Sequence, residues 1–227
     1  MKGMYGQLPL TDLGPLSALE RLAVGKVTSV YSAQLDGRKV ALKIFKPRSV
    51  RRHASRHALN IAEFEYERNR AFAEAPELRR YVAAPIGFIH TPGISAMVQE
   101  LLDGDLYFNV SRLRGGPLPE VFDLIGHVVE LAHALDLYDL DLHAMNVLVV
   151  REGGREIPKL FDFNRIPFHE HPRNPFEAFA LKTGILDRGS RDRRKLRQFH
   201  DFERLLRRRG RTEEGSIVPD LSIVPDL

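Results

Sequence analysis

The feature that most constrains this chain is a set of oxygen-bearing side chains placed beside short apolar runs. Asp141 and Asn146 stand before the run "VLVV", and Asp162 lies inside the run "PKLFDF". A buried carboxylate costs free energy unless it is paired or binds a cation. The turn "REGGREI" would join the two runs as a hairpin and bring Asn146 and Asp162 to one edge. Because Mg²⁺ prefers carboxylate and amide oxygens, the sequence predicts a magnesium site at Asn146 and Asp162.

A lysine stands inside an apolar strand earlier in the chain. In "VALKIF", Lys43 shares one strand face with Ala41 and Phe45, so its charge needs a partner. The helix predicted over residues 50–74 offers three acidic candidates, Glu63, Glu65 and Glu67. Glu63 and Glu67 lie one turn apart and therefore share a face. An ion pair with this helix would hold Lys43 rigid.

Hydrophobic periodicity predicts a strand-rich part followed by a helical part. Residues 20–46 predict three strands, with a turn at Gly25 and a hairpin at "LDGR", and residues 85–102 predict another hairpin. Residues 117–136 predict an amphipathic helix, and residues 165–210 are expected to be mostly helical. This order is typical of an α+β fold with two lobes, and a cleft between them is the expected ligand site.

Composition narrows the setting of the protein. The 227 residues include no cysteine, which excludes disulfides and thiolate metal sites. There is no signal-peptide core and no apolar run of about 18 residues, so we expect a cytoplasmic protein without a membrane span, in its own cell or in a host cell to which it is delivered.

The end of the chain is basic. Residues 188–211 hold eleven Arg and Lys against three Asp and Glu, which indicates a solvated helix or a peripheral contact with an anionic partner. No nucleic-acid partner is expected, because Phe199 and Phe202 are predicted to face the core rather than to stack on bases.

The order of these motifs resembles that of the protein kinase-like superfamily. "VALKIF" resembles the V-A-I-K strand motif, "FEYE" the F-x-x-E of the kinase helix, and "MVQELLDGDL" the hinge. "DLDLHAMN" resembles the catalytic loop and "DFN" the D-F-G motif. The resemblance covers about residues 20–165 and implies a β-rich N-lobe with one main helix and a reduced helical C-lobe. The expected boundaries are an N-terminal extension at 1–19, the N-lobe at 20–102, the C-lobe at 103–210, and a disordered tail at 211–227 with the repeat "SIVPDLSIVPDL".

The resemblance also implies an ATP- and Mg²⁺-dependent phosphotransferase. Asp141 would be the catalytic base and Lys43 the phosphate-contacting lysine, with Glu67 as the ion-pair partner of Lys43. Asn146 and Asp162 would bind the metal. The further ATP-contacting residues that it implies are Gly25, Thr28, Ser29, Val30, Ala41, Glu100 and Leu102.

Several departures from the kinase pattern leave the acceptor open. The loop "AVGKVTSV" keeps only Gly25, and Asp139 and Leu140 stand where the catalytic loop usually has His and Arg. The "D-L-H-x-x-N" form resembles aminoglycoside phosphotransferases, and the short C-lobe resembles lipopolysaccharide-core sugar kinases and small bacterial effector kinases. We expect a protein Ser/Thr hydroxyl as acceptor. The alternatives are a small-molecule or lipopolysaccharide sugar hydroxyl, and a pseudokinase that binds partners without turnover.

Overall fold

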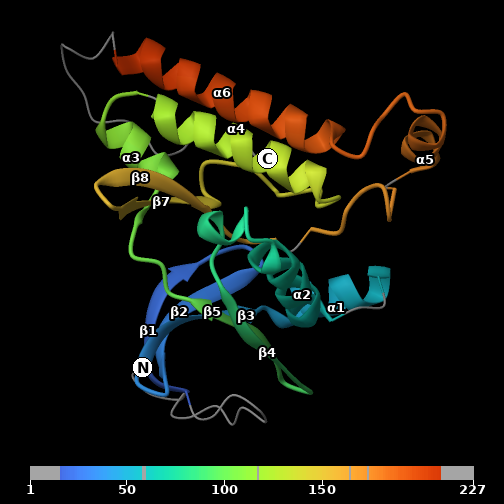
Figure 1. Cartoon of the computed structure of the whole chain (residues 1–227). Coiled ribbons are helices and arrows are strands. Elements are labelled where there is room, and N and C mark those ends of the chain that lie inside the picture. The colour runs from blue at the N-terminus through green and yellow to red at the C-terminus, as the bar shows by residue number, and fades with distance from the viewer. Residues whose placement is uncertain (1–15, 58–59, 117, 164, 173, 211–227) are drawn as a thin grey trace.

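The chain folds into two lobes, one built on a sheet and one mainly helical (Figure 1). The computed structural model describes residues 16–57, 60–116, 118–163, 165–172 and 174–210, with residues 203–210 described by backbone alone. Residues 1–15, Asn164 of the "DFN" motif, and the tail at 211–227 with its repeat lie outside the described residues.

A five-stranded antiparallel sheet in the order β1-β2-β3-β5-β4 forms the first lobe. Its strands are β1 (Leu16–Val24), β2 (Thr28–Leu35), β3 (Arg38–Phe45), β4 (Pro85–Thr91) and β5 (Ile94–Glu100). The predicted hairpins are confirmed, and Asp36 and Gly37 turn with φ of 49° and 76°. The first strand begins at Leu16, ahead of the boundary expected at residue 20, because the Leu16 side chain is fully buried in the core of this lobe.

The single helix predicted over residues 50–74 is wrong, because the chain forms two helices there. These are α1 (Pro47–His57) and α2 (Ile61–Glu74). Asn60 has an extended backbone, and its side-chain oxygen accepts hydrogen bonds from the backbone N–H groups of Ala62 (2.8 Å) and Glu63 (3.2 Å). Such a cap satisfies free donors at the start of a helix, so Asn60 begins α2. Helix α2 packs against β4 and β5.

The second lobe joins a small sheet to four helices. Strands β6 (Asp105–Leu106), β7 (Val147–Glu152) and β8 (Arg155–Leu160) form its sheet. The helices are α3 (Tyr107–Leu113), α4 (Pro119–Ala134), α5 (Pro175–Lys182) and α6 (Ser190–Gly210). A 3-10 turn at Arg79–Tyr81 and a bridge between Val82 and Leu160 connect the two lobes.

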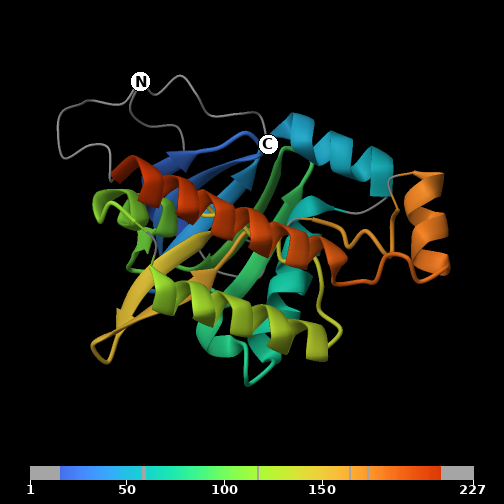
Figure 2. The same ribbon diagram turned by 90° about the horizontal axis from the view of Figure 1, so that it is seen from above.

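The core of the second lobe lies between α4, α6 and the small sheet. The predicted amphipathic helix is confirmed, and α4 buries Val121, Ile125, Val128, Val129 and Ala132. Helices α4 and α6 run side by side (Figures 1 and 2), and Phe199 of α6 is buried with its ring 4.8 Å from that of Tyr107. None of the helices that the structure describes is both long and apolar enough to cross a membrane.

Candidate active site

Lys43 lies at the centre of a buried charge cluster on β3. Val30 of β2 pairs directly with Lys43, and Ala41 lies two residues before it, so all three side chains share one face of the sheet. The Lys43 side chain is only 5% exposed; its Nζ contacts the Glu65 carboxylate and lies 2.9 Å from Oδ1 of Asp162. Burial alone lowers the pKa of Lys43, but the two carboxylates outweigh it and raise the pKa above its ordinary value. Lys43 is therefore held as a cation between two elements.

The predicted partner Glu67 is wrong, and Glu65 takes its place. Glu67 lies 2.7 Å from Arg70 on the exposed side of α2, where both side chains are about half exposed (46% and 48%). Residues that are two positions apart in a helix lie about 200° apart around its axis, so Glu65 and Glu67 cannot share a face. Glu65 shares its face with Ile61 and Phe72, which the structure buries. Burial raises the pKa of Glu65, and the Lys43 ammonium opposes that rise.

Asp141 stands at a strained point of the loop before β7. Its φ is 50°, and its Oδ2 lies 2.8 Å from Nε of Arg165, while its buried Oδ1 has no hydrogen-bond partner in the part of the chain that the structure describes. Burial raises the pKa of the Asp141 carboxyl, and the Arg165 guanidinium opposes the rise. A carboxylate with a raised pKa and an unused oxygen is suited to accept a proton.

Asn146 and Asp162 are brought together as the hairpin prediction required. Val147 pairs with Leu160, and the backbone N–H of Phe161 donates to the Asn146 carbonyl at 3.2 Å. Asn146 therefore lies opposite Phe161, the residue before Asp162. Asn146 Nδ2 donates to the Asp141 carbonyl at 3.1 Å, which turns the opposite atom, Oδ1, outward as a candidate ligand.

This pair fits a magnesium ion bound jointly with a nucleotide. Among the described residues, no group of three or more His, Cys, Asp or Glu side chains could hold a metal alone. Mg²⁺ commonly takes one or two protein oxygens and completes its shell with phosphates and water. Asn146 and Asp162 match that requirement, and the Mg²⁺ role of both stays a proposal.

A buried network anchors the loop before β7 to α6, and sequence reasoning missed it. Asp192 accepts hydrogen bonds from the backbone N–H groups of Asp139 (2.7 Å) and Leu140 (2.9 Å). The Asp139 carboxylate pairs with Arg191 at 2.7 Å and accepts from the Phe168 N–H at 2.9 Å. Asp139 therefore anchors the loop through both its backbone and its side chain. Reading residues 188–211 as a uniformly solvated helix is wrong for Arg191 and Asp192, which are buried.

Helix α2 links the charge cluster to the second lobe. Arg68 Nη2 donates to the Tyr138 carbonyl at 2.5 Å, and the Phe72 ring stacks on the Phe163 ring with centroids 4.4 Å apart. Glu65 of the same helix holds Lys43 of β3. Helix α2 therefore positions Lys43, the loop before β7 and the segment after β8 relative to one another.

The other predicted nucleotide residues lie at the ends of strands. The Gly25 N–H donates to the Thr28 carbonyl at 2.8 Å and closes the β1–β2 turn, and Ser29 follows in β2. Glu100 ends β5 and is fixed by two hydrogen bonds with the Ala84 backbone (2.8 and 3.1 Å), and Leu102 follows in the connector to the second lobe. Their contacts with ATP stay predictions.

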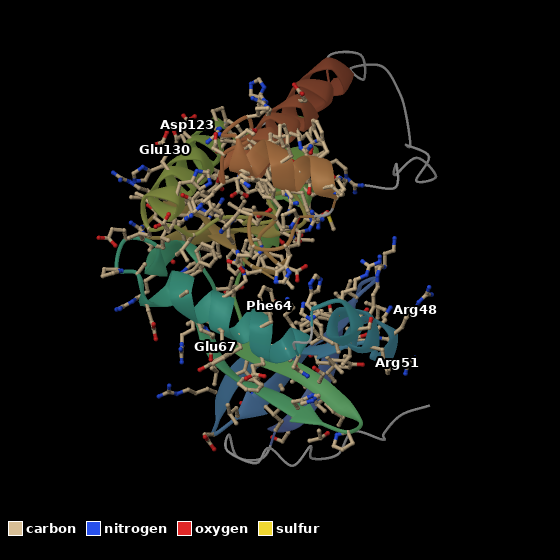
Figure 3. All side chains as sticks on the ribbon, turned by 90° about the vertical axis from the view of Figure 1, so that its right-hand side faces the viewer. Arg48, Arg51, Phe64, Glu67, Asp123 and Glu130 are labelled. Carbon is tan, nitrogen blue, oxygen red and sulfur yellow. The ribbon has the colours of Figure 1, made fainter. Side chains whose placement is uncertain are left out.

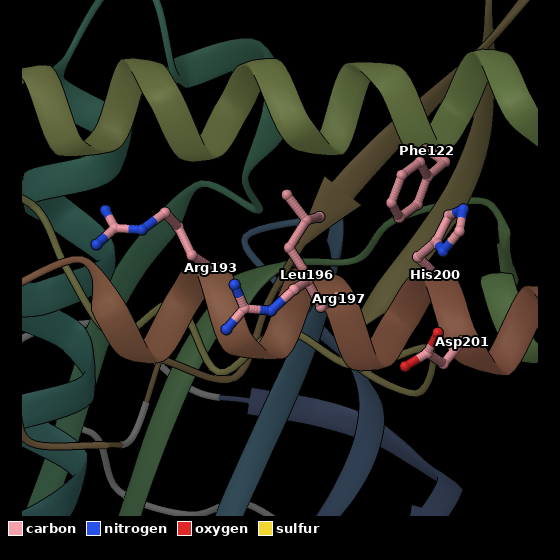
Figure 4. A pocket seen from close by; sticks show the side chains of 6 residues that line it. All are labelled: Phe122, Arg193, Leu196, Arg197, His200 and Asp201. Carbon is pink, nitrogen blue, oxygen red and sulfur yellow. The ribbon is translucent and has the colours of Figure 1, made fainter.

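A hollow of about 500 Å³ lies away from this site, between α4 and α6 (Figure 4). Its lining residues are Phe122, Arg193, Leu196, Arg197, His200 and Asp201. The lining includes acidic and basic residues, and it contains none of the residues of the charge cluster around Lys43.

Comparison with known proteins identifies the fold. No family model matches the sequence, and no curated protein matches it. Among solved structures, 1595 chains match, including the crystal structure of Rad53 1-466 in complex with AMP-PNP. That match has a TM-score of 0.54 and 19% sequence identity, and it covers 65% of this chain and 38% of the Rad53 chain. The chain therefore has a protein kinase-like α+β fold, with a β-rich N-lobe and a helical C-lobe.

Proposed function

We propose that this protein is an ATP- and Mg²⁺-dependent phosphotransferase that delivers the γ-phosphoryl group of ATP to a hydroxyl. The observation that carries the proposal is the buried Lys43 held between Glu65 and Asp162, at the junction where Asn146 and Asp141 also lie. The Lys43 ammonium provides positive charge for the phosphates, and the carboxylate of Asp162 and the amide of Asn146 provide oxygens for a metal.

Each residue has a distinct part in the proposed reaction. Lys43 contacts the α- and β-phosphates. Asn146 and Asp162 would hold Mg²⁺, which would neutralise negative charge on the phosphates. The acceptor hydroxyl oxygen bonds to the γ-phosphorus, the bond to the β–γ bridging oxygen breaks, ADP leaves, and Asp141 takes the hydroxyl proton. The protein supplies positioning and charge neutralisation, which is the main requirement of phosphoryl transfer.

The remaining predicted residues form the nucleotide envelope in this proposal. Gly25, Thr28 and Ser29 lie along the phosphates, and Val30 and Ala41 contact the adenine. The hinge supplies backbone hydrogen bonds to the adenine from Glu100 and Leu102. Support for a nucleotide site comes from the shared fold, since the Rad53 structure contains AMP-PNP.

The proposed acceptor is a protein Ser or Thr hydroxyl, and a small-molecule or sugar hydroxyl is the alternative acceptor. One observation favours a different function, that of a pseudokinase. The Arg165 guanidinium lies 2.8 Å from Oδ2 of Asp141, so one oxygen of the proposed base is already engaged. Arg165 is partly exposed, with 36% of its side chain accessible, so an incoming acceptor can displace it without unfolding the loop.

Incubation with γ-labelled ATP and Mg²⁺, alone and with a cell lysate, tests the proposal. The Asp162→Ala protein is the matched control, because it lacks one proposed metal ligand. Label in protein bands with wild type and not with the variant is the expected result, and mass spectrometry then identifies the acceptors. ATP consumption without labelled protein directs the search to small-molecule hydroxyls. Nucleotide binding without turnover contradicts the phosphotransferase proposal.

A further inference from the structure

Helix α1 presents an arginine face that no acidic side chain accompanies. Arg48, Arg51, Arg52 and Arg56 are exposed, and α1 contains no Asp or Glu. None of the four has a carboxylate partner among the described residues. Arg48, Arg52 and Arg56 recur every four residues and Arg51 is three residues after Arg48, so the four form one continuous face, and Arg48 and Arg51 project outward (Figure 3).

Helix α5 and the turn after it expose large apolar side chains. Phe176 is 72% exposed, Phe179 is 58% exposed and Ile185 is 68% exposed. Phe176 and Phe179 are three residues apart and therefore lie on one face of α5, while Ala180 is buried. Single exposed apolar residues are ordinary, whereas exposed apolar residues that form a contiguous patch are typical of interaction sites.

A ring contact joins the end of α1 to the segment before α5. The His57 ring at the end of α1 meets the His171 ring before α5, edge to face, with centroids 5.3 Å apart. Figures 1 and 2 both show α1 and α5 on the same side of the molecule, away from the connector between β5 and β6. The chain reaches α5 directly from the segment that carries Asp162 and Arg165.

We propose that α1 and α5 together form a docking surface for an acidic, amphipathic segment of the protein acceptor. The four arginines of α1 would pair with its carboxylates, and Phe176, Phe179 and Ile185 would receive its apolar side chains. This proposal rests on the proposed function, because it names the class of acceptor that this phosphotransferase selects.

A protein partner fits this surface better than an anionic membrane does. Arg165, which lies 2.8 Å from Asp141, precedes α5 by ten residues, so a polypeptide held on α5 lies at most about 36 Å from Asp141. Docking in this way raises the local concentration of a hydroxyl at the reacting site, which a bare lipid surface does not do.

Binding of a model helix tests the docking surface without requiring turnover. The probe is a fluorescein-labelled helix with glutamates along one face and leucines along the other, followed by anisotropy. A second peptide has Gln at every Glu. We expect the acidic helix to bind the full-length protein about tenfold more tightly than the Gln helix. A roughly tenfold ratio of Kd values corresponds to the combined free energy of a few exposed ion pairs.

Matched variants locate the binding. Arg48→Glu with Arg52→Glu should weaken binding of the acidic helix about tenfold. Phe176→Ser with Phe179→Ser should weaken binding of both peptides. The control is Arg112→Glu with Arg155→Glu, two exposed arginines of α3 and β8, and it should leave binding unchanged. Equal binding of both peptides, or equal loss in the control, overturns the proposal.

Two further measurements separate the outcomes. If phosphatidylserine vesicles bind through the same arginines and the acidic helix does not bind, the surface is a membrane contact. That result overturns the proposal. In the labelled-ATP assay, excess acidic helix should reduce label in acceptor bands while the Gln helix does not. Failure of peptide binding with transfer intact refutes only the docking surface, and intact peptide binding without transfer refutes only the proposed function.

Discussion

Replacing Glu65 by Gln should damage both stability and activity, whereas replacing Glu67 by Gln should damage neither. Glu65 is fully buried and contacts Lys43, whose side chain is 5% exposed. Removing one member of a buried ion pair costs about 3–5 kcal/mol when the other charge is left uncompensated. Lys43 keeps Asp162 at 2.9 Å, so we expect a smaller loss, about 2–3 kcal/mol.

The two variants are compared by thermal unfolding and by phosphate transfer. For a chain of this size, a loss of 2–3 kcal/mol corresponds to a melting temperature roughly 4–12 °C lower. Glu67 forms only an exposed pair with Arg70, worth about 0.5 kcal/mol or less. Transfer by the Glu65→Gln protein should fall about a hundredfold, because Lys43 loses its fixed direction. A larger effect from Glu67→Gln than from Glu65→Gln would refute the assignment.

Three other changes test separate parts of the account. Asp141→Asn should abolish transfer but raise the melting temperature at neutral pH. Burial raises the pKa of Asp141, so the carboxyl stabilises the fold fully below its ordinary pKa, and this stabilisation is lost as pH rises through the raised pKa. Arg165→Gln should move the acidic limb of the pH–rate profile to higher pH, because the guanidinium holds the pKa of Asp141 down. Gly104→Ala should lower stability in denaturant titration by about 1–3 kcal/mol, because its Cβ would lie 2.7 Å from the Val149 carbonyl oxygen.

The local parts of the fold could be predicted from the sequence. Alternating polar and apolar residues on both sides of "LDGR" predict two strands, and the apolar stripe of residues 119–134 predicts a helix. Both predictions are confirmed. Lys43 could be found because a cation between apolar strand neighbours needs a partner. Glu65 could also have been found, because it is spaced at i+4 from Ile61 and at i−7 from Phe72, which marks the buried face.

The long-range parts of the site could not be predicted in this way. Asp192 anchors the Asp139 backbone across 53 residues of sequence, and its neighbours are mostly basic residues that resemble a solvated helix. No local pattern marks such a residue, because its role depends on how α6 packs under the loop. The start of α2 at Asn60 differs from this case, because an Asn followed three residues later by Glu63 is a helix-start signal that the sequence itself carries.

The measurement that tests the central claim most directly separates nucleotide binding from phosphate transfer at Asp141. ATP binding with Mg²⁺ is measured by calorimetry for wild type and for Asp141→Asn, and transfer from labelled ATP to lysate proteins is measured for the same two proteins. The account predicts equal binding by both, with transfer by the wild type alone. Equal transfer by the two proteins, or binding without transfer by the wild type, would contradict it.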